Sequence, residues 1–458
     1  MTNLEERIAA HQNQLNSTAF PGFGHALRPY YGFDENYVPL NNGSFGACPN
    51  YVLDIYKEFL HEAERRPDRF VRLQYRPYLQ QARKELAQLV KCDQEDLVLV
   101  PNATSAVNAV LRSFNGRWQQ GDAILVYETI YGACGKAVQY IIDSNESFKL
   151  RIVKVPLSYP LTHEQVLSAT RDAIQHARAE QITIKIAVVD AISSIPGVIV
   201  PWEQLCALFR QHSILSLVDG AHAVGQIPLD LCSADPDFFI SNCHKWLSCH
   251  RGVALLYTPK RNQSLALAIP TSHEYISPNL ATPPELFPTN ATSNYVSSWE
   301  WTGTIDLGNY LTIPYALQFR RWMGGENAIM QYNCNLALKA GTAFASKLGK
   351  NSHLMQFPNS SSSPSNQSLT AAMANISIPI ATSNAEQGDA NQLAFIAASL
   401  QTKLMQQHDT FVMFYPHAGK VWARLSAQVW LEERDFIWAA ERIAELLQQQ
   451  EFQLKPSA

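Results

Sequence analysis

The sequence lacks an excess of charge of either sign, a long apolar run and any regular spacing of cysteines. Its 36 Lys plus Arg stand against 40 Asp plus Glu, which leaves a formal net charge of −4 over 458 residues. A surface this nearly balanced has no general attraction for nucleic acid or for an anionic membrane. We therefore expect any anion that binds this protein to occupy a local pocket.

The apolar runs are too short to span a bilayer, which requires about 20 consecutive apolar residues. The first twenty residues include Glu5 and Glu6 and have no apolar core segment, so they do not resemble a secretory signal. No CxxC pair occurs among the eight cysteines, which are Cys48, Cys92, Cys134, Cys206, Cys232, Cys243, Cys249 and Cys334. We expect free thiols in a soluble, cytoplasmic protein rather than disulfides or a zinc site.

Short apolar runs alternate with amphipathic helical patterns between about residues 95 and 260. Continuous apolar runs separated by helices are typical of a mostly parallel sheet that is buried on both faces. The sequence therefore predicts an α/β protein. We expect a polar, irregular N-terminal arm over 1–50, a large domain over 51–310 that begins with two helices broken at Pro67, and a smaller α+β domain over 311–458.

Two polar residues, Asp219 and Lys245, each follow a short apolar run and lie 26 positions apart. Two parallel strands that end at the same sheet edge can bring such side chains into one pocket. Pyridoxal phosphate chemistry needs this pair, because a lysine forms the Schiff base and an acid keeps the pyridine nitrogen protonated. Taken alone, the two residues are equally compatible with a local ion pair or with exposure to solvent.

Four further segments carry a resemblance to a known family. They are NATSAVNAV (102–110), VDGAHAVGQ (218–226), DFFISNCHKW (237–246) and WTGTID (301–306). Together they resemble the class V branch of fold-type I pyridoxal phosphate enzymes, and within it the isopenicillin N epimerase-like group that includes hercynylcysteine sulfoxide lyases. The resemblance covers about residues 38–310 and a C-terminal arginine motif. It implies a large domain with a mostly parallel seven-stranded sheet, and pyridoxal 5'-phosphate as cofactor.

The resemblance assigns the cofactor contacts to named residues. Lys245 is implied to be the Schiff-base lysine, Asp219 the partner of the pyridine nitrogen, and His222 a hydrogen-bond partner of the phenolic oxygen. The phosphate is implied to bind Thr104, Ser105 and His244, with Thr302 reaching it from the partner subunit of a homodimer with shared active sites. An ordinary helix N-cap at Thr104 and Ser105, or a structural histidine in a turn, would look the same in sequence.

The substrate contacts follow from the same resemblance. Tyr131 is implied to stack on the cofactor ring and to assist the leaving group, although a core tyrosine at a helix start would fit as well. Arg424 is implied to bind the substrate α-carboxylate as a bidentate ligand; a strand arginine on a solvated face is the alternative. Asn42 and Gly43 match the family's LNHGSFG segment, and Asn42 replaces its histidine.

The expected reaction is β-elimination from a cysteine derivative or its sulfoxide. Lys245 would remove the α-proton, the C–S bond would break, and pyruvate and ammonia would form. The alternatives are epimerisation or racemisation, tailoring of a secondary metabolite by γ-substitution, decarboxylation or transamination, and a cofactor-binding scaffold without catalysis. Cysteine desulfurase chemistry is not expected, because Cys334 lies in a helical pattern and 351–390 contains no cysteine; a reactive Cys134 stays open.

Specificity for the distal part of the substrate is expected from loops, which carry most binding variation in this kind of fold. The candidates are residues 271–300 and the N-terminal arm. No metal site is expected.

Overall fold

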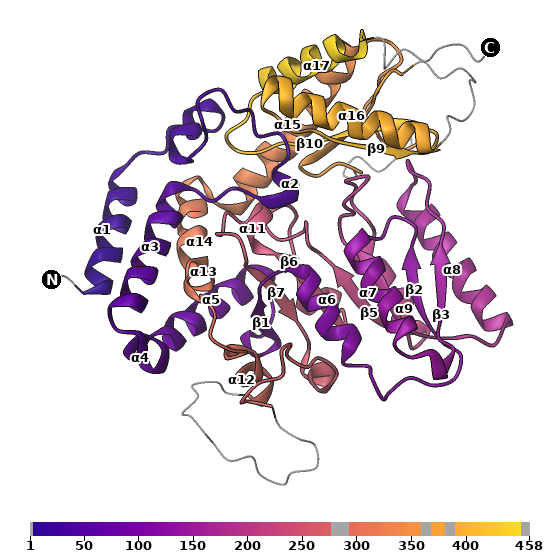
Figure 1. Cartoon of the computed structure of the whole chain (residues 1–458), viewed down its shortest axis with the longest axis horizontal. Coiled ribbons are helices and arrows are strands. Elements are labelled where there is room, and N and C mark those ends of the chain that lie inside the picture. Colours follow the sequence, from indigo (N-terminus) through magenta and orange to yellow (C-terminus); the bar gives the residue numbers. More distant parts are fainter. Residues whose placement is uncertain (1–2, 276–292, 359–367, 381–389, 450–458) are drawn as a thin grey trace.

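The chain is organised around a seven-stranded sheet, as Figure 1 shows. The computed structural model describes residues 3–275, 293–358, 368–380 and 390–449. The strand order is β1-β7-β6-β5-β4-β2-β3; the strands span Leu97–Val100 (β1), Asp122–Tyr127 (β2), Arg151–Val155 (β3), Thr183–Asp190 (β4), Leu215–Asp219 (β5), Phe238–Asn242 (β6) and Ala254–Tyr257 (β7). Neighbouring strands from β3 to β6 are parallel, and β7 is antiparallel to β6 and β1. The predicted mostly parallel, seven-stranded α/β fold is confirmed.

Successive residues of the central strands point into two different apolar cores. Ile124 and Ile186 belong to the core that contains α6 and α7, whereas Leu125 and Ala187 belong to the core that contains α8 and α9. These helices span Ala103–Arg112 (α6), Gly132–Asp143 (α7), His163–Ala179 (α8) and Trp202–Gln211 (α9). Because both faces of the sheet are covered, its strands form continuous apolar runs in the sequence.

The helices that precede the sheet follow the predicted break at Pro67. They are α3 (Asn50–Arg65), the single turn α4 (Pro67–Arg69), a π-helical turn (Phe70–Gln74) and α5 (Tyr75–Val90). Helix α3 ends before the proline, which has no amide hydrogen to continue the ladder. The shorter helices further along the chain are α10 (Leu231–Ala234), α11 (Cys243–Trp246), α12 (Asn294–Glu300), α13 (Gly308–Leu311) and α14 (Ile313–Trp322).

The N-terminal residues differ from the predicted irregular arm, because they form helix α1 (Leu4–Ser17). Its start has a reciprocal capping box, in which Asn3 accepts from the Glu6 amide and Glu6 accepts from the Asn3 amide. Three apolar residues of α1 are buried, namely Leu4, Ile8 and Leu15. These three residues form a narrow apolar stripe, which is difficult to recognise in a segment that is otherwise mostly polar. The arm continues to the short helix α2 (Asn42–Phe45), which lies next to α11.

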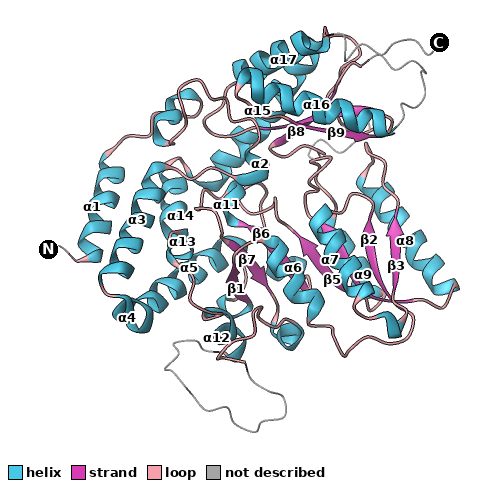
Figure 2. Ribbon diagram, viewed as in Figure 1, coloured by secondary structure: helices cyan, strands magenta, loops and turns pink. Residues whose placement is uncertain are grey.

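A three-stranded antiparallel sheet in the order β8-β10-β9 lies in the C-terminal part (Figure 2). Its strands are β8 (Met373–Ser377), β9 (Met413–His417) and β10 (Lys420–Ser426), and its helices are α15 (Gly325–Leu348), α16 (Ala390–His408) and α17 (Glu433–Leu447). Helix α16 is not predicted from the sequence, since exposed Phe395 and Met405 blur its apolar stripe. The domain boundaries at residues 50 and 310 stay a prediction.

Several hydrogen bonds join the loop after β4 to the second sheet. The Gly197 amide donates to Asn375 Oδ1 at 2.9 Å, and Arg424 Nη1 donates to the carbonyl of Ser194 at 2.7 Å.

No helix among the described residues has the length and apolar character that a membrane crossing requires.

Candidate active site

A cavity of about 130 Å³ opens where β4, β5 and β6 end. Parallel strands end at the same edge of their sheet, and ligands of α/β proteins bind outside that edge. Side chains reach the cavity from these strand ends, from the start of α6, from the residue before α7 and from α11. Six of the predicted site residues line it, namely Lys245, Asp219, His222, Thr104, His244 and Tyr131.

Lys245 and His222 face each other, with 3.1 Å between Lys245 Nζ and His222 Nε2. Trp246 Nε1 donates to His222 Nδ1 at 3.3 Å, so the proton of the neutral ring belongs on Nε2. His222 Nε2 then donates to Lys245 Nζ, which can accept only as a free amine. The contact therefore favours the unprotonated, nucleophilic form of the lysine.

Burial changes the pKa of both groups in the same direction. Loss of hydration lowers the pKa of Lys245 from 10.5 to about 8; the nearby Asp219 opposes this shift and Arg424 adds to it. Burial also lowers the pKa of His222 well below 6.5, and the charges of Lys245 and Arg424 lower it further. His222 is therefore neutral at physiological pH, and a fraction of Lys245 is the free amine.

The carboxylate of Asp219 accepts two hydrogen bonds at the end of β5. The Ala221 amide donates to Oδ1 at 2.9 Å, and Cys134 Sγ donates to Oδ2 at 3.2 Å. Asp190 ends β4 as the register partner of Asp219 and lines the same cavity. Burial, and then the charge of Asp219, raises the pKa of Asp190 well above 3.8. Its surroundings thus favour the protonated form of Asp190.

The N-terminus of α6 faces the cavity through Asn102, Ala103 and Thr104. Asn102 caps the helix, because its Oδ1 accepts from the Ser105 amide at 2.9 Å and from Ser105 Oγ at 3.1 Å. Ser105 itself is not among the residues that line the cavity. Asn242, at the end of β6, accepts from the Ala103 amide at 2.9 Å and holds this helix start against the sheet. A helix N-terminus of this kind suits a phosphate dianion.

His244 lies beside this helix start, in the same cavity wall. Its Nδ1 is 2.9 Å from the carbonyl oxygen of Val253, so Nδ1 carries a hydrogen and donates it. Burial lowers the pKa of His244 to about 4. The ring can therefore donate from Nε2 to a phosphate only after it gains a second proton, which a bound dianion would favour.

Arg424 is buried on β10, with 1% of its surface exposed. Nη1 donates to the carbonyl of Ser194 at 2.7 Å, and Nη2 donates to Asn41 Oδ1 at 3.0 Å and to Ser44 Oγ at 3.2 Å. Burial lowers the pKa of Arg424 to about 10. Among the described residues no carboxylate lies within ion-pair distance of it. A buried guanidinium that has only neutral partners is suited to an anionic ligand.

Asn42 and Gly43 lie on α2, against the residues that carry the lysine. Asn42 Nδ2 donates to the backbone carbonyl of Lys245 at 2.9 Å, and Asn42 Oδ1 is buried without a partner. The Gly43 amide donates to Ser426 Oγ at 3.0 Å. A Cβ at position 43 would lie 3.0 Å from Met373 Sδ, so a larger residue there would require the methionine side chain to shift. Neither residue lines the cavity of Lys245.

Tyr131 is the N-cap residue of α7, lines the cavity and is 48% exposed. Its phenol is thus available to a ligand rather than packed in a core. Thr302 lies in the loop between α12 and α13 and does not line this cavity. The role predicted for Thr302 requires a partner subunit and stays a prediction.

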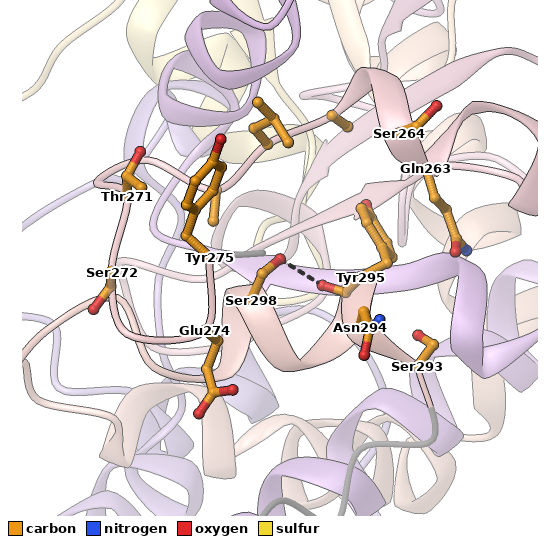
Figure 3. Close-up of a pocket in the computed structure, with 13 residues that line it drawn as sticks. Gln263, Ser264, Thr271, Ser272, Glu274, Tyr275, Ser293, Asn294, Tyr295 and Ser298 are labelled. Carbon is orange, nitrogen blue, oxygen red and sulfur yellow. Dashed lines mark hydrogen bonds between the residues drawn. The ribbon is translucent and has the colours of Figure 1, made fainter. Parts of the chain in front are cut away.

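Another cavity, of about 380 Å³, lies near α12 and contains none of the predicted site residues (Figure 3). Ser298 Oγ donates to the Tyr295 carbonyl in its wall, and Glu274 is the one charged side chain among its described lining residues. Its lining includes Tyr275 and Ser293, whereas residues 276–292 of the predicted specificity loop lie outside the described residues. In the described ranges, no three His, Cys, Asp or Glu side chains are grouped as a metal site.

Sequence reasoning missed several polar residues that complete the site. Asp190 closes an apolar strand just as Asp219 does, so the same signal could have identified it. Asn41 and Ser44 contact Arg424 from about 380 positions away, and no local pattern indicates this. Cys134, which was left open as a reactive group, is buried as a donor to Asp219, and its pKa is raised by burial and by that carboxylate.

These residues fit pyridoxal phosphate, the expected cofactor. Lys245 has a lowered pKa and faces a neutral histidine. Asp219 is held by an amide and a thiol in the same cavity, as a partner of a protonated ring nitrogen must be. The α6 N-terminus supplies a site for phosphate. Lysine, aspartate and helix start therefore line one cavity, and each has the chemistry to hold one functional group of the cofactor.

The fold and this cavity define an α/β protein of fold type I with a lysine at the carboxyl edge of its sheet. The chain belongs to the aminotransferase class-V family, whose sequence profile matches residues 47–274. The L-cysteine desulfhydrase-like protein lolT2 of Epichloe uncinata is 32% identical over 449 residues, which cover 94% of each chain. The class V resemblance is confirmed.

Two further similarities extend over nearly the whole chain. Hercynylcysteine sulfoxide lyase of Schizosaccharomyces pombe is 28% identical over 422 residues, or 92% of this chain and 97% of that protein. A solved structure of C-DES, with glycine covalently linked to its PLP cofactor, has a TM-score of 0.71 at 18% identity and covers 91% of this chain and 99% of that one. At this identity the likeness to C-DES supports the fold alone.

Proposed function

We propose that this protein is a pyridoxal phosphate-dependent lyase that cleaves the C–S bond of a cysteine derivative or a cysteine sulfoxide conjugate. The observation that carries the proposal is the contact between Lys245 Nζ and His222 Nε2 at 3.1 Å, beside Asp219 and the α6 N-terminus. The names of two relatives support it, because hercynylcysteine sulfoxide lyase and L-cysteine desulfhydrase-like protein both describe C–S chemistry.

The reaction needs each of these residues in a distinct role. When bound, pyridoxal phosphate supplies an electron sink for the negative charge that develops at the substrate Cα. Arg424 orients the substrate by its α-carboxylate, and Lys245 Nζ takes the proton from Cα. His222 Nε2 donates a hydrogen bond and keeps the amine in its basic form. Asp219 would stabilise the positive charge of the cofactor's protonated pyridine nitrogen.

Tyr131 is proposed to complete the elimination, because its exposed phenol can reach a group leaving from Cβ. The sulfur departs with the electrons of the broken C–S bond and takes a proton from the Tyr131 hydroxyl. It leaves as a thiol or, from a sulfoxide, as a sulfenic acid. Water hydrolyses the remaining three-carbon fragment to pyruvate and ammonium, so that the overall reaction consumes one water.

The test is product analysis with the purified, cofactor-loaded protein. Pyruvate and the released sulfur compound are measured after incubation with L-cysteine, S-substituted cysteines and cysteine sulfoxides. We expect equal amounts of both products from at least one of them and none with Lys245→Ala, whereas Lys260→Ala, which changes an exposed lysine outside the cavity, retains activity. Solvent deuterium at Cα without loss of the side chain would instead identify a racemase or epimerase, and the proposal would fail.

We further propose that the protein acts as a cytoplasmic homodimer in secondary metabolism, with Thr302 contacting the phosphate in the partner's site. Eight free thiols support a reducing compartment. Mixing the inactive variants Lys245→Ala and Thr302→Ala tests shared sites, because a mixed dimer carries both changes in one site and neither in the other. Partial recovery of activity is expected on mixing, and no recovery would contradict the shared arrangement.

A further inference from the structure

A second cavity, of about 400 Å³, lies between the N-terminal arm, α2 and the C-terminal part of the chain. No charged side chain is among its described lining residues, and most of its wall is aromatic or thioether. The residues that give it this character include Phe33, Tyr37, Phe45, Met405, Met413 and Trp430. The ring centroids of Phe33 and Trp430 are 5.2 Å apart, and those of Phe33 and Tyr37 are 6.2 Å apart. The cavity is therefore an aromatic pocket with a defined shape.

The aromatic pocket adjoins the cavity of Lys245 through two residues of the segment 41–44. Ser44 lines both cavities, and Asn41 lines the aromatic pocket. Both residues also hold the guanidinium of Arg424, at 3.0 Å from Asn41 Oδ1 and 3.2 Å from Ser44 Oγ. The segment 41–44 thus joins three features, namely the guanidinium of Arg424, the cavity of Lys245 and the aromatic pocket.

We propose that the aromatic pocket binds the S-substituent of the substrate and selects an uncharged aromatic or large apolar group. This inference rests on the proposed function, since it assumes that the substrate is an S-substituted cysteine. Phenyl and indole walls gain contact area and ring–ring contacts from such a group. Methionine side chains adapt to its outline, as they do at other apolar binding surfaces.

The same walls exclude a charged substituent. A carboxylate placed against these rings would lose part of its hydration, and no cation in the described lining would replace it. Unsubstituted cysteine is excluded for a different reason, because it leaves the pocket unfilled and gains none of this contact. The pocket therefore predicts a preference for aromatic conjugates over both acidic conjugates and cysteine itself.

The test compares S-benzyl-L-cysteine with S-(para-carboxybenzyl)-L-cysteine, which differ by one carboxylate. Pyruvate release by the holoenzyme gives kcat/KM for each compound. We expect the benzyl conjugate to be preferred by roughly tenfold or more, the discrimination that a substituent in an apolar pocket typically provides. Met405→Arg adds a cation at a half-exposed helix position, so it should raise kcat/KM for the carboxybenzyl conjugate and narrow the preference.

A matched pair of exposed phenylalanines separates a pocket effect from a general one. Phe45 lines the pocket and is 70% exposed, whereas Phe395 is 67% exposed on α16 and lines neither cavity. Phe45→Ala should lower the ratio of kcat/KM for S-benzylcysteine to that for L-cysteine, and Phe395→Ala should leave the ratio unchanged. An unreactive carbon analogue, 2-amino-5-phenylpentanoate, should inhibit wild type more strongly than Phe45→Ala.

Failure of this inference differs from failure of the proposed function. If no cysteine compound yields pyruvate, the proposed function is wrong and the inference falls with it. If pyruvate forms but the two conjugates react equally well, and Met405→Arg and Phe45→Ala leave the ratios unchanged, the aromatic pocket does not select the substituent although the lyase function holds.

Discussion

Cys134 donates its thiol hydrogen to Asp219 Oδ2 across 3.2 Å, inside the cavity that also holds Lys245. A cysteine in the same cavity as the proposed Schiff-base lysine invites the interpretation that it is a nucleophile. The contact with Asp219 argues against a nucleophilic role. The thiol must keep its hydrogen in order to donate it, and a thiolate would be repelled by the Asp219 carboxylate. Cys134 therefore serves Asp219 as a hydrogen-bond donor.

We predict that Cys134 resists alkylation while an exposed cysteine reacts. Burial and the adjacent Asp219 raise the pKa of Cys134, so the reactive thiolate is scarce at pH 8. Cys232 is exposed and serves as the internal reference. Limited treatment of the folded protein with iodoacetamide, followed by peptide mass spectrometry, should find the label at Cys232 and not at Cys134. Equal labelling of the two would contradict the donor role.

Uptake of the cofactor should depend on pH through Lys245. Burial lowers the pKa of Lys245 to about 8, so the amine is mostly protonated below this pH and free above it. The rate at which the apoprotein forms its lysine-linked cofactor absorbance should therefore rise up to about pH 8 and then level off. A lysine of ordinary pKa would give a rate that keeps rising towards about pH 10. A rate of cofactor attachment that continues to rise above pH 9 would contradict the prediction.

Much of the fold could be predicted because its strands are buried on both faces. Runs such as 97–100 and 186–189 have no polar interruption, and the helices between them keep helical spacing. Helix α1 was missed although Asn3 and Glu6 have the spacing of a capping box. Helix α16 could not be recognised, because Phe395 and Met405 place apolar side chains on its exposed face.

Some residues of the site could be predicted from local sequence, whereas others are brought together only by the fold. Asp219 ends β5 and Lys245 lies three residues after the end of β6, so local sequence predicts their shared edge. The hydrogen bonds from Arg424 to Asn41 and Ser44 join residues about 380 positions apart, and packing alone creates them. The protonation of His222 likewise follows from the Trp246 indole, whose position is known only from the folded structure.

Asp190→Asn should make the apoprotein more stable at pH 8. The pKa of Asp190 is raised by burial and by Asp219, which means that the folded protein favours the protonated carboxyl. The unfolded chain ionises the same group near its ordinary pKa of about 3.9, so wild type loses stability as the pH rises above that value. Asparagine keeps a neutral group of the same shape and avoids this loss.

Thermal unfolding of wild type and Asp190→Asn from pH 5 to pH 8 measures the effect. The melting temperature of the variant should exceed that of wild type at pH 8, and the difference should shrink towards pH 5. Asp122→Asn is a control for a buried aspartate elsewhere in the sheet, since Asp122 accepts from the Gln119 amide and lies near Lys185. Asp122→Asn should lower the melting temperature at pH 8. If Asp190→Asn also lowered the melting temperature, the interpretation that the folded protein favours a protonated Asp190 would be contradicted.

Replacement of Arg424 should separate stability from substrate binding. The guanidinium is buried with neutral partners only, so the apoprotein bears the cost of an uncompensated charge. Arg424→Met keeps much of the side-chain volume and removes that charge. We therefore expect a higher melting temperature for the apoprotein, together with a fall in kcat/KM of roughly 100-fold or more, since the substrate carboxylate loses its partner. Arg424→Lys keeps the charge but not the paired donors, so it should recover part of the binding and none of the added stability. A Met variant with unchanged KM would exclude Arg424 as the carboxylate site.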